Sequence, residues 1–547
     1  MGLYKGLIGG FLNSLYQFPE RPALEVDHKV LSYKELWNKA AKIAASIQST
    51  QSVQKKVASM LAYRSETAYA SILGILATGR GYVPLNPTFP PERTQRMIEL
   101  SEVDVLVVGN ECFSMLEKLL GTLDKSLWII FESEEDIGYW SKHYPRHHYF
   151  GFGATSPELI MNSMDDFSVS ENSCAYLLFT SGSTGIPKGV PVSHGNVRSY
   201  IEYIAERYQV TEQDRFSQMF DMTFDLSVHD MFVAWERGAC VCCVPEKYLM
   251  APGDFINKRE LTMWFSVPSV AMFMSGYRLL KPNSLPSLRY SLFCGEALSA
   301  KLAAEWQAAA PHSIVENLYG PTETTIAICH YRWNDKESPQ QCINGIVPIG
   351  YPFEGQQVCV VKEIKQSGDQ KEVILAEVGE SGELCLSGSQ VTGGYLNNPE
   401  KTKDQYIQIP ALGSQIWYRT GDLVKQDESG CLYFLGRIDT QIKIFGHRIE
   451  LGEIDAVLRE TAGTEMIISI AWPIKEGRAT GIVAFAGGNV ELSEKAIINA
   501  CRKKLPDYMI PKRVYFLDKL PLNVNGKIDR LQLQKILEEE AFGKRTP

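Results

Sequence analysis

The stretch LFTSGSTGIPKGV, residues 178–190, carries the clearest structural signal in the chain. It starts as an apolar run typical of a buried strand, continues into a loop rich in glycine and hydroxyl side chains, and leads into the strand-like Val190-Pro-Val192. Glycine lets backbone N–H groups approach an anion, hydroxyls donate to phosphate oxygens, and Lys188 adds positive charge. We therefore predict a phosphate-binding loop between two strands. A flexible Ser/Gly linker is the alternative, and the flanking strands argue against it.

Other nucleotide and nucleophile motifs do not fit this chain. The Walker pattern GxxxxGK[ST] cannot be threaded through the loop, and neither GxSxG nor GxGxxG occurs. The sequence therefore does not support an α/β-hydrolase or a dinucleotide-binding oxidoreductase.

Around this loop, helical patterns alternate with short apolar runs. Helices are predicted over 35–49 and 68–77, and buried strands over 56–62 and 103–108. That alternation is typical of a parallel sheet with crossover helices. The sequence thus predicts an α/β fold for the first part of the chain.

The pattern changes after about Tyr351. Short strands separated by turns predict a small, mainly antiparallel β subdomain over about 351–436. A polar turn follows near Gly436, and the rest has its own α+β pattern. We expect an N-terminal core over 1–436 and a C-terminal α+β domain over 437–547.

Length and composition restrict the class of protein. At roughly 100–200 residues per domain, 547 residues predict three or four structural units. Hydrophobic residues at 45% and charged residues at 22% are ordinary for a globular protein. The net charge of −9 offers no broad basic field, so nucleic acid is not expected as a partner. No apolar run of about 18 residues occurs, so we expect no stable membrane insertion.

The twelve cysteines are scattered through apolar segments without the spacing of a disulfide framework, so we expect a cytoplasmic location. Cys240-Val-Cys-Cys243 opens an apolar strand, and no second pair stands at zinc-finger spacing, which predicts core cysteines. His143, His147 and His148 have a spacing that suits a metal, but the stretch around them is predicted to be an exposed loop. Neither group predicts a metal site.

Six further stretches follow the loop in a fixed order. They are Tyr319-Gly-Pro-Thr-Glu-Thr324, Gly382-Glu-Leu384, Tyr418-Arg-Thr-Gly-Asp-Leu423, Gly436-Arg-Ile-Asp-Thr-Gln-Ile-Lys443, Gly446-His-Arg-Ile-Glu-Leu-Gly-Glu-Ile454 and Asn525-Gly-Lys527. With the loop, this set resembles the acyl-adenylate-forming superfamily, which includes acyl-CoA synthetases, luciferases and the adenylation domains of non-ribosomal peptide synthesis. The resemblance covers nearly the whole chain. It implies a large α/β core with a small β subdomain and a mobile α+β C-terminal domain.

The resemblance also implies ATP as cosubstrate and assigns residues to it. The implied ATP-binding residues are Thr180, Ser181, Gly182, Ser183, Thr184, Gly185, Lys188, Tyr319, Asp422 and Arg437. By resemblance, the loop holds the β- and γ-phosphates, Tyr319 stacks on adenine, and Asp422 accepts both ribose hydroxyls beside Arg437. A turn-forming aspartate is the alternative for Asp422.

Three residues are implied in catalysis. Attack on the α-phosphate requires positioning and charge neutralisation. Thr322 is expected to contact the α-phosphate, and Glu323 to hold Mg²⁺ with a hard carboxylate oxygen. Lys527 is expected to bridge the attacking carboxylate and the α-phosphate as charge builds there. A solvated surface lysine is the alternative for Lys527.

Two further positions match the family's interdomain hinge and its thiol tunnel. Asp439 matches a hinge about which the C-terminal domain rotates between adenylation and thioester formation. Gly446 would then lie beside the tunnel for the incoming thiol. The alternatives are a turn residue at 439 and a strand-end glycine at 446.

The segment from Phe220 to Asp230 distinguishes subfamilies. In adenylation domains for amino acids, an aspartate at the position of Asp225 pairs with the substrate ammonium, which needs a partner in a water-poor pocket. An aspartate that caps a helix starting at Leu226 is the alternative.

Phe224-Asp-Leu-Ser-Val228 and Phe293-Cys-Gly-Glu296 resemble D-alanine–carrier-protein ligases and related stand-alone amino-acid activators. The implied substrate pocket comprises Phe224, Asp225, Leu226, His229, Ser266, Leu292, Cys294, Leu318, Ile326 and Ala327. Such a pocket suits a small or medium neutral amino acid. His229 and Leu318 depart from a strict D-alanine enzyme, so side chain and handedness stay open.

These implications combine into one predicted reaction. ATP and an amino acid give aminoacyl-AMP, and the aminoacyl group passes to a phosphopantetheine thiol. About twenty residues follow Lys527, too few for a carrier domain, so we expect a carrier protein in trans. The alternatives are an acyl-CoA synthetase and a non-catalytic binding module with the same fold.

Overall fold

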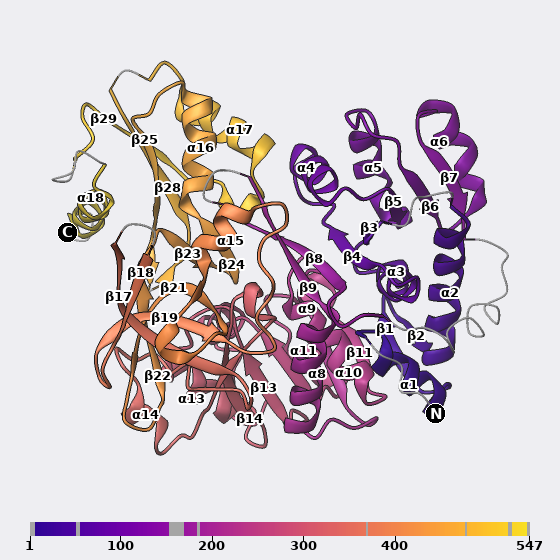
Figure 1. The fold of residues 1–547 in the computed structure, drawn as a ribbon, viewed down its shortest axis with the longest axis horizontal. Helices are drawn as coiled ribbons and strands as arrows, with labels where there is room; N and C mark the ends of the chain where they lie inside the picture. The colour runs from indigo at the N-terminus through magenta and orange to yellow at the C-terminus, as the bar shows by residue number, and fades with distance from the viewer. Residues whose placement is uncertain are drawn as a thin grey trace. The chain divides into compact units, whose positions relative to one another are not determined.

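The structure is a computed structural model that describes residues 6–50, 55–152, 169–182, 186–367, 370–475, 478–488, 490–522 and 528–543 (Figure 1). Contacts between Cα atoms divide the chain into two compact units. The first comprises Met1–Pro87, Met97–Phe179 and Gly189–Ile438, and the second comprises Thr88–Arg96, Thr180–Lys188 and Asp439–Pro547. The second unit therefore includes the predicted phosphate loop together with the C-terminal segment.

One sheet of the first unit has seven strands in the order β7-β6-β5-β3-β4-β8-β9. The strands are β3 (Val57–Leu61), β4 (Gly81–Leu85), β5 (Val105–Val108), β6 (Trp128–Phe131), β7 (His148–Gly151), β8 (Cys174–Thr180) and β9 (Lys188–Ser193). The neighbours from β7 to β8 run parallel, as predicted. All residues of β3, β4 and β5 are buried, as expected for parallel strands covered on both faces.

Five helices precede or join these strands. They are α2 (Tyr33–Ser49), α3 (Glu66–Ala77), α4 (Pro91–Ser101), α5 (Phe113–Leu120) and α6 (Ile137–His143). Helices α2 and α3 begin at side-chain caps on Ser32 and Ser65. At the start of α2, Ser32 and Glu35 form a capping box in which each side chain bonds the other residue's backbone N–H. Helix α3 joins β3 to β4 and packs against both strands and α2 (Figure 1).

A second sheet has nine strands in the order β16-β15-β14-β13-β12-β10-β11-β1-β2. The strands are β1 (Pro22–Val26), β2 (Lys29–Ser32), β10 (Arg215–Gln218), β11 (Cys240–Cys243), β12 (Met263–Ser266), β13 (Tyr290–Phe293), β14 (Ile314–Tyr319), β15 (Cys329–Arg332) and β16 (Tyr351–Pro352). The strands from β1 to β14 run parallel, and β2, β15 and β16 add antiparallel edges. The carboxyl ends of β10, β12, β13 and β14 therefore meet at one edge, where ligands of such sheets bind.

Further helices of the first unit are α1 (Gly9–Gln17), α8 (His194–Arg207), α11 (Gly253–Lys258), α12 (Pro268–Gly276), α13 (Ala300–Ala309), α14 (Ser338–Gln341) and α15 (Pro399–Gln405). The prediction of an α/β fold with a parallel sheet is confirmed.

The small β sheet has the order β18-β17-β19-β21-β20, with β22 paired to β21. The strands are β17 (Gln357–Ser367), β18 (Gln370–Leu375), β19 (Ser381–Ser387), β20 (Tyr406–Gln408), β21 (Ile416–Gln426) and β22 (Leu432–Arg437). All these pairs are antiparallel, as predicted. Alternate residues of β19 enter different clusters, Leu384 and Leu386 on one face and Cys385 on the other.

The C-terminal segment is α+β, as predicted. It contains the hairpin β23 (Gln441–Ile444) and β24 (His447–Glu450), the sheet strands β25 (Ile467–Ala471), β28 (Ile482–Gly487) and β29 (Val514–Leu517), and the helices α16 (Leu451–Ala462), α17 (Glu494–Lys504) and α18 (Arg530–Gly543). Ile467 on β25 packs in the cluster that contains α16 and α17. Its neighbour Ile468 packs with Leu533 of α18 on the other face.

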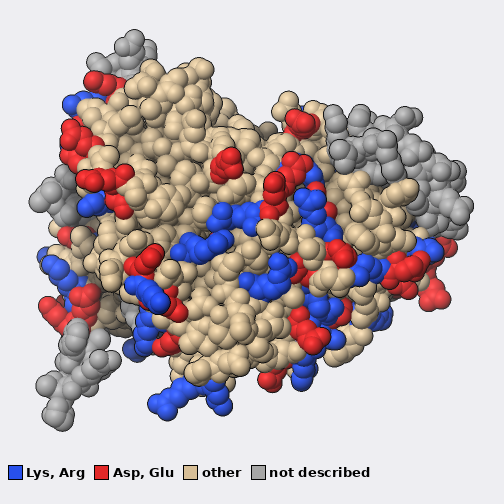
Figure 2. Space-filling model, turned by 90° about the horizontal axis from the view of Figure 1, so that it is seen from below, with Lys and Arg blue, Asp and Glu red and all other residues tan. Residues whose placement is uncertain are grey.

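Three features relate to the predictions on nucleic acid, membrane insertion and compartment: the surface charges, the helices and the cysteines. Basic and acidic side chains interleave on the face shown in Figure 2. Among the described residues, no helix combines the length and apolar character needed to span a bilayer. All twelve cysteines carry free thiols, and ten of them are buried.

Candidate active site

The predicted phosphate loop connects β8 to β9. Ser183, Thr184 and Gly185 lie outside the described residues. At Gly182, an added Cβ would stand only 1.9 Å from the carbonyl oxygen of Ile186. Glycine is therefore required at this position unless the loop moves.

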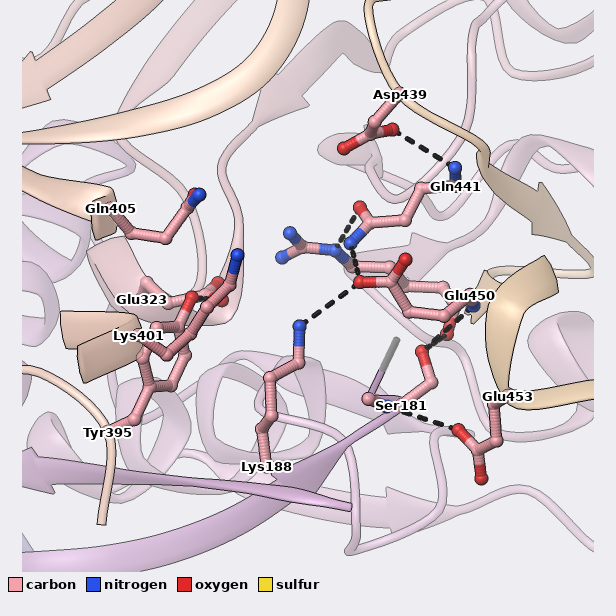
Figure 3. Close-up of polar contacts among 12 residues, drawn as sticks. Ser181, Lys188, Glu323, Tyr395, Lys401, Gln405, Asp439, Gln441, Glu450 and Glu453 are labelled. Carbon is pink, nitrogen blue, oxygen red and sulfur yellow. Dashed lines mark hydrogen bonds and ion pairs between the residues drawn. The ribbon is translucent and has the colours of Figure 1, made fainter. Parts of the chain in front are cut away.

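The hydroxyl of Ser181 connects the loop to the end of β24. Its Oγ donates to the carbonyl oxygen of Arg448 at 2.8 Å and accepts from the backbone N–H of Glu450 at 3.2 Å (Figure 3). The preceding Thr180 is half-buried, and its Oγ1 has no hydrogen-bond partner among the described residues.

Two glutamates of the second unit bind the loop's cationic and N–H groups. The N–H of Gly182 donates to Oε2 of Glu453 at 3.1 Å, and Nζ of Lys188 lies 3.1 Å from Oε1 of Glu450 (Figure 3). The side chains of Lys188 and Glu450 are only 10% and 9% exposed. Glu453 also forms a buried ion pair with Arg93. The N–H of Gly182 and the ammonium of Lys188 are thus paired with carboxylates.

A second cluster brings together three residues predicted to bind the nucleoside. Asp422 on β21 stands opposite Arg437 on β22. Its Oδ1 accepts from Arg437 at 2.6 Å, and its Oδ2 accepts from the hydroxyl of Tyr319 at 2.5 Å. Burial, with the neighbouring carboxylate, holds the pKa of Tyr319 well above its ordinary value. A buried carboxylate with two acceptor oxygens is chemically suited to a diol. Adenine stacking by Tyr319 stays a prediction.

Thr322 and Glu323 lie on η5, a 3₁₀ turn over Thr322–Thr324. Glu323 is fully buried, and its Oε1 accepts from the hydroxyl of Tyr395 at 2.8 Å (Figure 3). A carboxylate and hydroxyl oxygens are the donors that Mg²⁺ prefers, so the chemistry of these side chains fits that ion.

Asp225 is 7% exposed and stands just before the short helix α9 (Leu226–Val228). Its side chain makes no capping hydrogen bond to that helix, which argues against the alternative of a helix-capping aspartate. Instead, Oδ2 accepts from the N–H of Ile326 at 3.2 Å. Desolvation raises the pKa of Asp225 to about 6, against the opposing effect of hydrogen bonds from Thr322 and Ile326.

The side chains predicted to line the substrate pocket lie mostly in one buried cluster. Leu226, Leu292, Cys294, Leu318, Ile326 and Ala327 all belong to it. Ser266, at the end of β12, is fully buried and accepts from the indole N–H of Trp264 at 3.0 Å. Phe224 is half-buried. These apolar residues thus belong to the large core of the first unit, and Asp225 reaches that core through its hydrogen bond to Ile326.

His229 begins a π-helical turn, η3, over His229–Val233. Its Nδ1 lies 2.8 Å from the hydroxyl of Tyr200, and its ring packs 4.5 Å from that of Phe265. Its Nε2 is buried without a hydrogen-bond partner among the described residues. Burial lowers the pKa of His229 to about 3, so the imidazole is neutral at physiological pH.

The predicted hinge and tunnel residues flank strand β23. Oδ1 of Asp439 accepts from the N–H of Gln441 at 3.0 Å. Gly446 has φ of 78° and follows Phe445 with φ of 50°, and two positive φ values at a two-residue loop are typical of a type I′ turn. Gly446 therefore lies at the tip of a hairpin. Lys527 lies outside the described residues.

The residues set aside as metal ligands have structural partners. His147 is buried and accepts from the N–H of Leu127 at 3.2 Å. Glu25, Cys240 and Cys242 could together reach one ion, but Glu25 pairs with Arg215 at 2.6 Å. The predicted exposed loop before His147 is wrong in part, because α6 ends at His143 and buries Trp140.

Four residues of these clusters have no role assigned from the sequence, namely Arg93, Tyr395, Glu450 and Glu453. The two glutamates stand at the start of α16, where acidic residues are common because they complement the helix dipole. Both glutamates lie within the Gly446–Ile454 motif, but the resemblance assigned a role there to Gly446 alone. Arg93 and Glu453 are 360 residues apart in the sequence, and no local pattern connects them.

Known families and proteins match this chain over most of its length. The profile of the AMP-binding enzyme family matches residues 11–396, and that of the AMP-binding enzyme C-terminal domain matches residues 453–527. The L-proline–(L-prolyl-carrier protein) ligase of Pseudomonas fluorescens is 32% identical over 96% of this chain and 98% of its own length. A linear gramicidin synthase of Brevibacillus parabrevis is also 32% identical over 94% of this chain, but the chain spans only 9% of that protein.

Solved structures share the fold. The Vibrio cholerae adenylation domain AlmE, in complex with glycyl-adenosine-5′-phosphate, superposes with a TM-score of 0.87 at 34% identity and covers 98% of both chains. An o-succinylbenzoate CoA synthetase from Bacillus subtilis has a TM-score of 0.73 at 20% identity, which shows the fold alone. These matches confirm both the predicted fold class and the resemblance read from the ordered motifs: the chain belongs to the AMP-binding enzyme family.

Proposed function

We propose that the protein is an amino acid–carrier-protein ligase that uses ATP. It converts a small or medium neutral amino acid into aminoacyl-AMP and then passes the aminoacyl group to the phosphopantetheine thiol of a separate carrier protein. The observation that carries this proposal is the buried carboxylate of Asp225, which accepts a hydrogen bond from Ile326 of the apolar core. A substrate ammonium would supply the opposite charge that such a carboxylate needs.

In the first half-reaction, a carboxylate oxygen of the amino acid attacks the α-phosphorus of ATP. The bond from that phosphorus to the bridging oxygen breaks, and pyrophosphate leaves. We assign the β- and γ-phosphates to the loop Thr180–Lys188, the α-phosphate to Thr322, the ribose to Asp422 and Arg437, and adenine to Tyr319. In-line attack depends mainly on such positioning.

Glu323 is the residue we assign to Mg²⁺, since its carboxylate oxygen is a hard donor. The ion, when bound, neutralises charge on the phosphates. The hydroxyl of Tyr395 orients Glu323 through the 2.8 Å hydrogen bond.

In the second half-reaction, the pantetheine sulfur attacks the carbonyl carbon of the aminoacyl-AMP. The thiol loses its proton and AMP leaves. We propose a hinge at Asp439 between a core over 1–436 and a mobile domain over 437–547, with Gly446 beside the thiol. The hairpin tip at Gly446 supports this role, because glycine leaves room for a passing chain.

Two relatives support a small substrate. One was solved with glycyl-adenosine-5′-phosphate, and another is named for L-proline. The neutral imidazole of His229 and the surrounding apolar side chains favour an uncharged substrate side chain.

ATP–pyrophosphate exchange with a panel of acids tests the proposal. The panel contains D- and L-alanine, glycine, serine, proline, larger neutral amino acids, fatty acids and aryl acids. Exchange confined to amino acids supports the ligase, and exchange only with acids that lack an amine supports an acyl-CoA synthetase. If no acid forms an adenylate, the chain is a non-catalytic binding module.

A variant of Lys527 gives a second test. We expect Lys527→Ala to slow pyrophosphate exchange by roughly a thousandfold or more, since it removes the charge that stabilises the transition state. Its unfolding temperature should stay close to that of the wild type. Near-normal exchange in this variant would refute the role.

We also propose a cytoplasmic location. The twelve free cysteines support a reducing compartment, where ATP and carrier proteins would also be available.

A further inference from the structure

Two anion-binding groups of the phosphate loop, the N–H of Gly182 and the ammonium of Lys188, bind carboxylates. The N–H of Gly182 binds Oε2 of Glu453 at 3.1 Å, and Nζ of Lys188 binds Oε1 of Glu450 at 3.1 Å (Figure 3). A backbone N–H at a glycine-rich loop and a lysine ammonium are the same groups that bind phosphate oxygens. A carboxylate presents oxygen acceptors and negative charge in much the same way.

We propose that Glu450 and Glu453 are intramolecular substitutes for the β- and γ-phosphates of ATP. They hold the loop when no triphosphate is bound, and ATP competes with them for Gly182 and Lys188. The inference rests on the proposed function, because it requires this loop to bind the phosphates of ATP.

Other contacts hold both carboxylates toward the loop. Glu453 pairs with Arg93, and the two side chains are 2% and 6% exposed. Glu450 also accepts from the side-chain amide of Gln441, which in turn accepts from Nε of Arg448 at 2.8 Å. Charges this deeply buried need fixed partners. The glutamates are therefore built into the second unit and are not mobile surface groups.

The backbone at the start of α16 fixes their positions further. Glu450 precedes the first residue of the helix and Glu453 lies in its first turn. The N–H of Glu450 donates to Oγ of Ser181 at 3.2 Å. One short segment thus offers the loop two carboxylates and a backbone N–H that donates to the loop's Ser181, and a triphosphate must displace the two carboxylates.

Competition of this kind has a specific consequence. The apparent association constant for ATP equals the intrinsic constant multiplied by the fraction of molecules in which the glutamates have released the loop. AMP lacks the β- and γ-phosphates and does not compete. When pyrophosphate leaves after adenylation, the carboxylates can rebind the loop while the aminoacyl-AMP stays bound.

The test compares two nucleotides on three variants by isothermal titration calorimetry. The α,β-methylene analogue of ATP carries the β- and γ-phosphates and cannot be cleaved at the α–β position, and AMP lacks both groups. We expect Glu450→Gln and Glu453→Gln to bind the analogue roughly tenfold more tightly than the wild type does, because one charge-assisted bond of the competing state is weakened. Affinity for AMP should not change.

Glu460→Gln is the matched control. Glu460 lies on the same helix α16, pairs with Lys504 and is 66% exposed, so its replacement should leave both affinities unchanged. Thermal unfolding establishes that each variant is folded. If Glu453→Gln does not fold because Arg93 loses its partner, Glu450→Gln alone decides.

The outcomes separate the inference from the proposed function. Unchanged affinity of folded Glu450→Gln for the analogue overturns the competition and leaves the ligase proposal standing. An equal gain for AMP and the analogue also overturns it. A wild-type protein that binds neither nucleotide overturns the proposed function, and the inference falls with it.

Discussion

Burial of Asp225 acts in opposite directions on the free protein and on the substrate complex. Desolvation raises the pKa of this carboxyl from 3.8 to about 6, so its charged form at neutral pH destabilises the unliganded fold. A substrate ammonium would offset that cost by pairing with the charge. One residue is thus expected to weaken the free protein and to strengthen amino-acid binding.

Asp225→Asn separates these two effects. We expect kcat/KM for the amino acid to fall by about a hundredfold or more, since loss of one partner of a buried ion pair costs about 3–5 kcal/mol. The unfolding temperature at pH 7 should rise, because no desolvated charge remains. Pyrophosphate exchange and thermal unfolding measure the two effects. Turnover equal to that of the wild type would remove the basis for an amino-acid substrate.

The same variant has a defined pH dependence. The folded-state pKa of Asp225 lies above its ordinary value, so its contribution to stability is present below about pH 4 and is lost as the pH rises through about 6. That rise in pKa corresponds to about 3 kcal/mol. The stability gain of Asp225→Asn in urea unfolding should therefore be near zero below pH 4 and greatest above pH 7. KM for the amino acid in the wild type should fall as the pH rises through 6.

Asp427 is the matched control for that experiment. Hydrogen bonds from Ser429 and Tyr433 lower its pKa despite some burial, so its contribution has the opposite sign. Its stabilising effect is present above pH 4 and is lost as the pH falls. Asp427→Asn should destabilise the protein at pH 7 without changing KM, and parallel pH curves for the two variants would contradict this assignment.

At the scale of helices and strands, local signals predicted the elements well. Helix α2 begins at Tyr33, two residues before the predicted start, because Ser32 provides the cap. The strands on either side of the loop, β8 and β9, also occur as predicted, since apolar runs act locally. Helix α6 was missed because Trp140 packs on Phe113 and Phe131, distant residues that no helical periodicity reveals.

Sequence patterns did not predict which residues of distant elements contact one another. Asp422 and Tyr319 were each assigned to the nucleotide by resemblance, but their hydrogen bond joins residues 103 positions apart. The hydrogen bond between Glu453 and the loop residue Gly182 joins positions even farther apart, 271 residues in the sequence. Such pairs depend on tertiary folding, which sets strand order and helix placement. Sequence patterns therefore located candidate residues and could not assign their partners.

Gly182, in the loop between β8 and β9, allows a prediction about the loop as a whole. In Gly182→Ala, the new methyl would collide with the carbonyl oxygen of Ile186, so the loop must move. We expect kcat/KM for ATP to fall by roughly tenfold or more, because phosphate contacts depend on position. The free energy of unfolding, from thermal denaturation, should change by no more than about 1 kcal/mol.

Gly276→Ala is the matched control for the loop. Gly276 ends α12, and a Cβ there meets no atom within 4 Å. This variant should keep full exchange activity. If Gly182→Ala also keeps it, the loop geometry is not required for ATP binding.

At the scale of the whole chain, the proposed reaction needs two chemically different encounters with one acyl group. The first joins it to the α-phosphate, and the second exposes its carbonyl carbon to a thiol. A hinge at Asp439, the first residue of the C-terminal segment of the second unit, would let one chain serve both. A hinge of this kind acts through the backbone, so a backbone restraint should affect only the step that needs the other arrangement.

Asp439→Pro applies that restraint. Proline fixes φ near −65° and disfavours helical geometry at the preceding Ile438. We expect pyrophosphate exchange to stay within about twofold of the wild type while loading of a phosphopantetheinylated carrier falls by roughly tenfold or more. Asp439→Ala removes the 3.0 Å hydrogen bond to the N–H of Gln441 and leaves the backbone unrestrained, so it should retain both activities. An equal loss of both activities in the proline variant would argue against a hinge, and a selective loss of loading in both variants would assign the effect to the aspartate side chain.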